Sequence, residues 1–144
     1  MKYYIQFFTF MCILIGVCSC SQNAKTQQQD EKEGISETVG SDRFSQLIAD
    51  TAKVVVLDVR TKEELGEDCI QGAIHININD SDFREQCLKR LPKDKVVAVY
   101  CRTGFRSKTA ANILKSAGYH AVNLREGIVG WKEEGRPVVK VNKR

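Results

Sequence analysis

One stretch, residues 96–107, constrains the fold of this chain more than any other. It opens with the apolar run Val96–Tyr100, whose lack of polar alternation is typical of a strand buried on both faces of a parallel sheet. After a short loop, apolar residues recur at helical spacing and a glycine follows them, at Ala110, Ile113, Leu114, Ala117 and Gly118. This spacing predicts a helix with Gly118 as its C-terminal cap. The order is therefore buried strand, tight loop and helix.

Cys101 stands in this loop, directly after the strand. In an open parallel sheet, ligands bind where the carboxyl end of a strand faces a helix N-terminus, because unpaired backbone N–H groups converge there. The helix dipole and the charges of Arg102 and Arg106 are expected to lower the pKa of the thiol and favour the nucleophilic thiolate. A lone cysteine is more often a small buried hydrophobe. The strand end, the two arginines and Gly104 together favour a catalytic nucleophile.

The rest of the domain alternates strand and helix patterns. Strands are predicted at 35–39, 54–58, 73–76, 96–100 and 121–124. Helices are predicted after Ser41 as N-cap, after the capping-box pair Thr61 and Glu64, over 82–91 with Phe83, Cys87, Leu88 and Leu91 inward, and over 127–134 with Trp131. This alternation predicts an α/β domain with a mainly parallel sheet of about five strands, flanked by helices on both faces.

Composition excludes several classes of function. The 144 residues suit one domain, and a formal charge of +4 is modest, with lysines and arginines scattered among acidic residues. We therefore expect no nucleic-acid partner. No group of His, Cys, Asp and Glu has metal-ligand spacing, and Gly104 stands alone in its loop without a nucleotide-binding fingerprint, so no metal and no cofactor are expected.

The N-terminus differs from the rest of the chain. Lys2 precedes a mostly apolar run at 3–17, which is shorter than the about 20 residues of a spanning helix and fits a secretory signal. The ending at 17–20 resembles the lipobox of bacterial lipoproteins, with Cys20 as the lipidated residue; an uncleaved signal anchor is the alternative. We predict a signal peptide at 1–19, a flexible polar tether at 20–34 and a domain at 35–144. Such a protein is exported and lipid-anchored to a bacterial membrane, facing the periplasm or the cell surface.

Three of the six cysteines fall in the domain, namely Cys69, Cys87 and Cys101. Export implies an oxidising compartment, so Cys69 and Cys87 either pair or remain two separate buried thiols, and spacing alone leaves both possibilities open. His75 lies in an apolar strand and is interpreted as structural, not as a catalytic base.

Asp58 and Arg60 end a second buried strand. They are interpreted as a structural ion pair that holds the loop after this strand, because an arginine–carboxylate fork mainly fixes geometry.

Several motifs together resemble those of single-domain rhodaneses. They are LDVR at 57–60, EE at 63–64, IQGAIHI at 70–76, YCRTGFRS at 100–107, LREGIVGW at 124–131 and GRPV at 135–138. The resemblance implies a five-stranded parallel sheet flanked by helices, and a sulfurtransferase that carries sulfur as a persulfide on Cys101. It implies a small anionic donor such as thiosulfate, and a thiol acceptor, either a small molecule or a protein, or cyanide.

The resemblance also assigns roles around Cys101. The loop residues Arg102, Thr103, Gly104, Phe105 and Arg106 would bind the substrate, with their N–H groups around the sulfur and the two arginines on the anionic donor. Asp58, Arg60 and Ser107 would support the site.

Some features leave other hypotheses open. Cys69 stands where many members have histidine, and Asp68 replaces a glycine, so Cys69 is either a second redox or sulfur-relay site or a packed thiol. A phosphatase or arsenate reductase would use a loop one residue longer between its cysteine and arginine than the loop between Cys101 and Arg106. An exported thiol-redox partner, or a sulfide-carrier or binding module without thiosulfate turnover, is the remaining alternative.

Overall fold

The strand that precedes Cys101 lies in the centre of the sheet. The computed structural model describes residues 33–66 and 68–141, and its main sheet has five parallel strands in the order β1-β6-β5-β2-β4. These are β1 (Ile35–Val39), β2 (Val54–Asp58), β4 (Ile74–His75), β5 (Val96–Tyr100) and β6 (His120–Leu124). All five predicted strands are present, with β1 at an edge, so the predicted fold class is confirmed.

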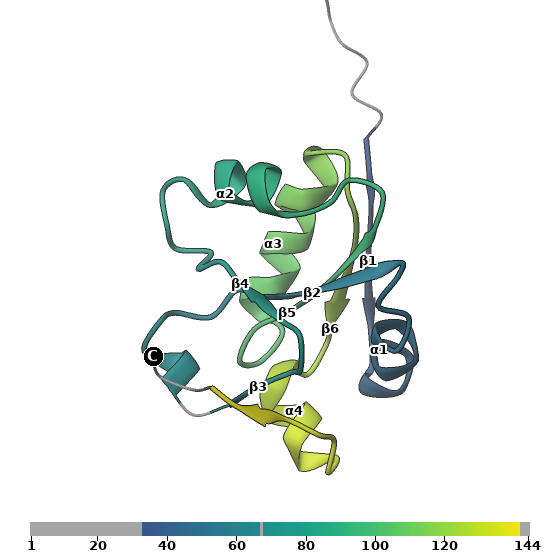
Figure 1. Cartoon of the computed structure of the whole chain (residues 1–144), viewed down its shortest axis with the longest axis vertical. Helices are drawn as coiled ribbons and strands as arrows, with labels where there is room; N and C mark the ends of the chain where they lie inside the picture. The colour runs from purple at the N-terminus through teal and green to yellow at the C-terminus, as the bar shows by residue number, and fades with distance from the viewer. Residues whose placement is uncertain (1–32, 67, 142–144) are drawn as a thin grey trace, which may run out of the picture.

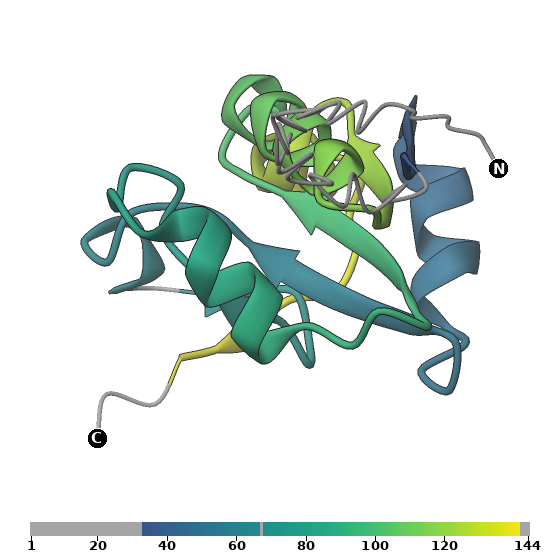
Figure 2. The same ribbon diagram turned by 90° about the horizontal axis from the view of Figure 1, so that it is seen from above.

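Helices cover both faces of this sheet (Figure 1 and Figure 2). They are α1 (Ser41–Ile48), α2 (Phe83–Arg90), α3 (Phe105–Ser116) and α4 (Gly127–Glu133), with the short 3-10 helix η1 (Glu64–Gly66) near the site. In the described ranges 33–66 and 68–141, no helix combines the length and apolar character that crossing a membrane requires.

The residues of β5 alternate between two hydrophobic clusters. Val97 and Val99 pack in the cluster beneath α2 and α3, whereas Ala98 and Tyr100 pack in the cluster beneath α1 and α4. Because both faces are covered, every residue from Val97 to Tyr100 is buried, which explains the unbroken apolar run.

A second sheet was not predicted. β3 (Asp68–Cys69) pairs antiparallel with β7 (Val139–Lys140), so the end of the domain returns beside the segment that follows η1 (Figure 1). Two residues per strand are too few to show a period in the sequence.

The C-terminus of α3 follows the prediction. Gly118 has a φ of +81°, and its N–H donates to the Lys115 carbonyl at 2.9 Å. The N–H of Tyr119 donates to the Leu114 carbonyl at 3.0 Å. Both bonds use carbonyls that the end of the helix leaves without intrahelical partners.

Two predictions about helix side chains are wrong. Ser41 is the first residue of α1, not its N-cap; Gly40 takes that position, and the Ser41 hydroxyl donates to Glu134 at 3.1 Å. Leu88 is 39% exposed, whereas Phe83, Cys87 and Leu91 are buried. At about 100° per residue, Leu88 falls beside the apolar stripe of α2 and not within it.

Candidate active site

The Cys101 thiol sits in a hydrogen-bonded cradle at the end of β5. Its side chain is buried, the N–H of Gly104 donates to Sγ at 3.2 Å, and the Ser107 hydroxyl donates to Sγ at 3.3 Å. Burial by itself raises the pKa of this thiol, but hydrogen bonds from Ser107 and from the backbone N–H groups of Thr103 and Gly104 lower the pKa below its ordinary value. The cradle therefore favours the thiolate.

The pKa is lowered as expected, but one source of the shift was not predicted. The sequence analysis named the helix dipole and the charges of Arg102 and Arg106, whereas the largest lowering contributions come from hydrogen bonds of the Ser107 side chain and the loop backbone. Ser107, which the sequence analysis placed only in a supporting role, thus touches the sulfur directly.

The shape of the loop depends on Gly104. It has a φ of +87°, and a Cβ built there would lie 1.9 Å from the backbone oxygen of Arg125. The turn between β6 and α4 thus approaches the loop more closely than any side chain at position 104 allows. A glycine at this position permits both the left-handed conformation and the close contact.

Helix α4 fixes the loop from the same side. The N–H of Ile128 donates to the Cys101 carbonyl at 2.9 Å, and the N–H of Val129 donates to the Arg102 carbonyl at 3.1 Å. Gly127 has a φ of +61°, and a Cβ there would lie 2.4 Å from the Arg102 carbonyl oxygen. The first turn of α4 therefore uses its unpaired N–H groups to hold the reactive loop. The sequence analysis did not assign this role to 127–129.

The predicted substrate-binding residues differ in their exposure to solvent. Arg102, Thr103 and Phe105 are exposed, with Phe105 79% accessible, whereas Gly104 is buried and contributes its N–H. Arg106 is only partly exposed and bonds to a carboxylate from another segment. The loop thus places one exposed guanidinium, that of Arg102, next to Cys101.

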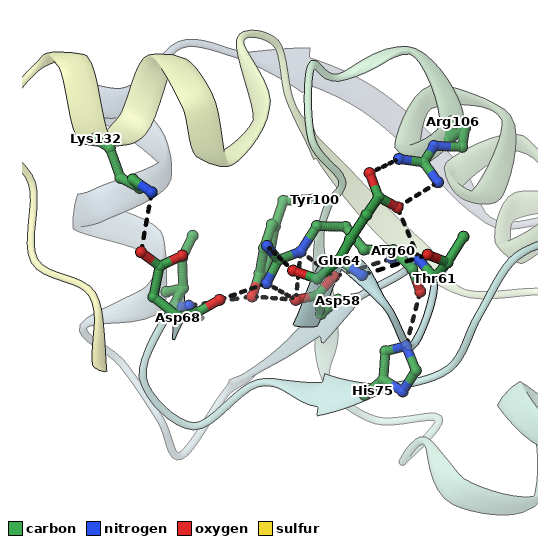
Figure 3. A network of polar contacts seen from close by, with 10 residues as sticks. Asp58, Arg60, Thr61, Glu64, Asp68, His75, Tyr100, Arg106 and Lys132 are labelled. Atoms are coloured by element: carbon green, nitrogen blue, oxygen red, sulfur yellow. Dashed lines mark hydrogen bonds and ion pairs between the residues drawn. The ribbon is translucent and has the colours of Figure 1, made fainter. Parts of the chain in front are cut away.

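The carboxylate belongs to Glu64, in η1. Its Oε2 and Oε1 atoms accept from Nη1 and Nη2 of Arg106 at 2.8 and 2.7 Å, and Oε2 also accepts from the N–H of Thr61 at 3.0 Å (Figure 3). The hydrogen bond from Arg106 is the main reason that the pKa of Glu64 falls to about 2. The predicted capping box is present, but the helix it opens is one turn long. No local pattern in the sequence indicated that Glu64 pairs with Arg106.

The predicted ion pair of Asp58 and Arg60 is present and buried. Arg60 Nη2 lies 2.7 Å from Asp58 Oδ2, and the Tyr100 hydroxyl donates to the same oxygen at 2.7 Å (Figure 3). Arg60 also donates to the backbone carbonyls of Glu64 at 3.2 Å and Asp68 at 2.7 Å. The pair therefore joins β2, β5, η1 and β3 behind the reactive loop.

An open hollow of about 300 Å³ lies beside the loop. Its lining includes Arg102, Glu63, Glu64 and Lys132, and Lys132 pairs with Asp68 at 2.9 Å (Figure 3). Side chains of both charge signs therefore border the space next to Arg102.

The other cysteines do not share the environment of Cys101. Cys69, Cys87 and Cys101 are three separate thiols in the structure, so Cys69 and Cys87 do not form a disulfide there. Burial raises the pKa of Cys87 to about 12, and burial also raises the pKa of Cys69. Of the three, only Cys101 has a lowered thiol pKa. Cys20 lies outside the described residues.

His75 contacts the backbone of the segment that follows β2. His75 Nε2 lies 2.7 Å from the Arg60 carbonyl oxygen, so this ring helps to fix the β2 loop (Figure 3). Within 33–66 and 68–141, no three His, Cys, Asp or Glu side chains come together as a metal ion would require.

The fold and the site together define an α/β domain with a buried cysteine of lowered thiol pKa in a strand-to-helix loop. A profile of the rhodanese-like domain matches residues 41–134. The chain belongs to this family.

Individual proteins agree with that assignment. A sulfurtransferase from Allochromatium vinosum is 37% identical over 102 residues, which cover 70% of this chain and 92% of that protein. A rhodanese-related protein from Thermoplasma volcanium is 37% identical with a TM-score of 0.61, covering 72% of this chain and 97% of that one. A rhodanese-like domain protein from Staphylococcus aureus is 26% identical with a TM-score of 0.61, covering 75% of this chain and 99% of its own.

Proposed function

We propose that this protein is a sulfurtransferase that carries a sulfane sulfur as a persulfide on Cys101. The observation that carries the proposal is the cradle of donors on the Cys101 sulfur, in which Gly104 and Ser107 lower the thiol pKa although the thiol is buried. A sulfur nucleophile that is already ionised needs no separate base. The similarity to a sulfurtransferase from Allochromatium vinosum supports the same reaction class.

The first half-reaction loads the sulfur. With thiosulfate as donor, the Cys101 thiolate attacks the outer sulfur, a new S–S bond forms, and the donor S–S bond breaks with its electron pair leaving on sulfite. The product is a Cys101 persulfide with one negative charge on its terminal sulfur. Backbone N–H groups of the loop stabilise this anion, as they stabilise the thiolate.

The second half-reaction discharges the persulfide. An acceptor thiolate, or cyanide in an assay, attacks the terminal sulfur and takes it, while the electron pair of the S–S bond returns to Cys101. Cyanide becomes thiocyanate, and a thiol becomes a persulfide. The exposed residues Arg102, Thr103 and Phe105 form the rim that either partner meets first.

Thiocyanate formation from thiosulfate and cyanide tests this function. We expect turnover by the protein, its loss in Cys101→Ser, and its retention in Cys69→Ser, which changes a thiol outside the loop. Loss of turnover in Cys69→Ser instead would support a sulfur relay through Cys69. If the folded protein shows no turnover while its Cys101 reacts with a thiol reagent, the redox and binding alternatives take precedence.

We also propose that this domain lies outside the cytoplasm. The basic start at Lys2, the apolar run at 3–17 and the cysteine at 20 support a lipoprotein signal at 1–19, with 20–34 as a tether between the lipid and the domain at 35–144. Metabolic labelling with an alkyne fatty acid in a bacterial host tests it. We expect label on the protein and none on Cys20→Ala; label that persists in Cys20→Ala would contradict the assignment of Cys20.

A further inference from the structure

Arg106 is the second cation of the reactive loop, and its terminal nitrogens are already occupied. Nη1 and Nη2 bond the two oxygens of Glu64 at 2.8 and 2.7 Å in a fork, and about a quarter of each side chain is exposed (Figure 3). Such bidentate pairs are the strongest that arginine forms with a carboxylate. An anion that arrives beside Cys101 therefore meets a guanidinium whose charge is already compensated.

Glu64 cannot swing away at small cost, because it is held from two other directions. Its Oε2 accepts from the N–H of Thr61 at 3.0 Å, and its own backbone carbonyl accepts from Arg60 at 3.2 Å. Arg60 in turn is fixed by the buried Asp58. The carboxylate is thus attached to the rigid network behind the loop, unlike an ordinary surface glutamate.

The charge of Glu64 is permanent in the physiological range. The hydrogen bond from Arg106 lowers the carboxyl pKa to about 2. The charge of Cys101 in turn contributes to the raised pKa of Arg106, so the ion pair lies within electrostatic reach of the sulfur. Glu64 also borders the hollow beside the loop, together with Arg102.

The remaining cation is Arg102. It is exposed, and no ion pair in the described residues involves it. One available guanidinium and one fixed carboxylate match a donor with a single negative charge. A donor with two negative charges finds only one uncompensated cation and is repelled by Glu64.

We propose that Glu64 is a specificity-determining residue that favours singly charged sulfur donors, such as persulfides and thiosulfonates, over the dianion thiosulfate. This inference rests on the proposed function and narrows its donor class. Glu64 acts here by occupying Arg106 and by its own charge, without taking part in the chemical step.

Binding of sulfate, an unreactive tetrahedral dianion, tests the inference without sulfur transfer. We compare the full chain with Glu64→Gln, which keeps a hydrogen-bonding side chain but removes the charge, and with Glu63→Gln as the matched control. Glu63 borders the same hollow but is exposed and forms no ion pair among the described residues. At fixed ionic strength, we expect sulfate to bind Glu64→Gln about tenfold more tightly than the unaltered protein. The sulfate affinity of Glu63→Gln should differ from that of the unaltered protein by less than about twofold.

A second test compares the KM values of two sulfur donors that have similar shapes but different charges. Thiosulfate and methanethiosulfonate differ by one charged oxygen replaced by a methyl group, and each would leave sulfur on Cys101, releasing sulfite or methanesulfinate. We expect Glu64→Gln to lower the KM for thiosulfate about tenfold and to change that for methanethiosulfonate less than about threefold.

The outcomes separate this inference from the proposed function. If Glu64→Gln binds sulfate no better, or more weakly, Glu64 only positions Arg106 for the donor and the inference is overturned, whatever the activity. If neither donor leaves sulfur on Cys101, the proposed function fails, while the sulfate affinities still decide whether Glu64 excludes dianions.

Discussion

Two neighbouring strands, β2 and β5, end at the same edge of the sheet, and the loops that follow them use their polar groups differently. The register pairs Asp58 at the end of β2 with Tyr100 at the end of β5. After β2, Asp58 and Arg60 satisfy each other inside the protein, together with the Tyr100 hydroxyl. After β5, the donors of the loop converge on one sulfur atom, that of Cys101, and leave exposed side chains around it.

This difference shows how a stable domain can hold a thiol of lowered pKa. At the end of β2, the charges of Asp58 and Arg60 are paired with each other and buried, which holds both side chains rigidly in place. At the end of β5, hydrogen bonds from Ser107 and the loop backbone lower the pKa of the Cys101 thiol, which favours the nucleophilic thiolate. The rigid loop supports the reactive one, because the N–H of Val59 donates to the Tyr100 carbonyl at 3.0 Å.

The largest expected effect on folding comes from breaking the rigid loop. Arg60→Met leaves Asp58 as an uncompensated buried charge, so we expect a loss of about 3–5 kcal/mol in the free energy of unfolding, measured with urea. The double variant Asp58→Asn with Arg60→Met removes the orphaned charge and should recover part of that loss. Equal stability of the two variants would show that the ion pair does not hold this loop.

A smaller change is expected to damage the reactive loop selectively. Gly104→Ala places a Cβ against the backbone oxygen of Arg125, at a φ of +87°, so the loop must shift. Strain of about 1–3 kcal/mol at such a position should appear as lost stability, whereas a displaced sulfur can cost activity about 100-fold. Thiocyanate formation and urea unfolding are compared on the same sample. Activity close to that of the unaltered protein would contradict the tight loop.

A smaller effect is expected from the hydrogen bond between Ser107 and the Cys101 sulfur. Ser107→Ala removes the side-chain hydrogen bond that is the largest contribution lowering the pKa of Cys101, so the thiol pKa rises. Below that raised pKa less thiolate is present, and we expect persulfide formation to slow about threefold to tenfold at neutral pH. At high pH, where both thiols are ionised, the difference should shrink. A constant ratio of rates across pH would point to a positional effect instead.

The smallest effect is expected from the partly exposed pair of Glu64 and Arg106. The pKa of Glu64 is lowered from 4.5 to about 2, so the pair stabilises the fold fully above the unfolded value. With a quarter of each side chain exposed, we expect Glu64→Gln to cost about 1 kcal/mol or less at neutral pH. The difference in the free energy of unfolding between the two proteins should vanish as the pH falls from 4.5 toward 2. A difference that stays the same at every pH would contradict an origin in the charge of Glu64.

Much of the fold could be predicted because its signals are local. Local sequence patterns predicted all five parallel strands, and Gly118 ended α3 where expected. The two-residue strands β3 and β7 could not be predicted, because their pairing joins Asp68 to Lys140 across the whole domain.

The site was predicted less completely than the fold. The sequence located Cys101, its loop and the pair of Asp58 and Arg60, all of which depend on neighbouring residues. The bond between Glu64 and Arg106 joins residues 42 positions apart, so no local pattern shows it. The capping-box motif already placed Glu64 in a turn after β2, and the family resemblance included EE at 63–64. These two signals could have brought Glu64 into the site.

The mass of the full chain after incubation with excess thiosulfate tests the central claim most directly. We predict a gain of about 32 Da, one sulfur atom, which cyanide removes as thiocyanate and which is absent in Cys101→Ser. Because oxidation to a sulfinic acid adds a similar mass but is not reversed by cyanide, the reversal identifies the persulfide. No gain from either thiosulfate or methanethiosulfonate on the folded protein with a titratable Cys101 thiol, or the same gain in Cys101→Ser, would contradict a sulfurtransferase centred on Cys101.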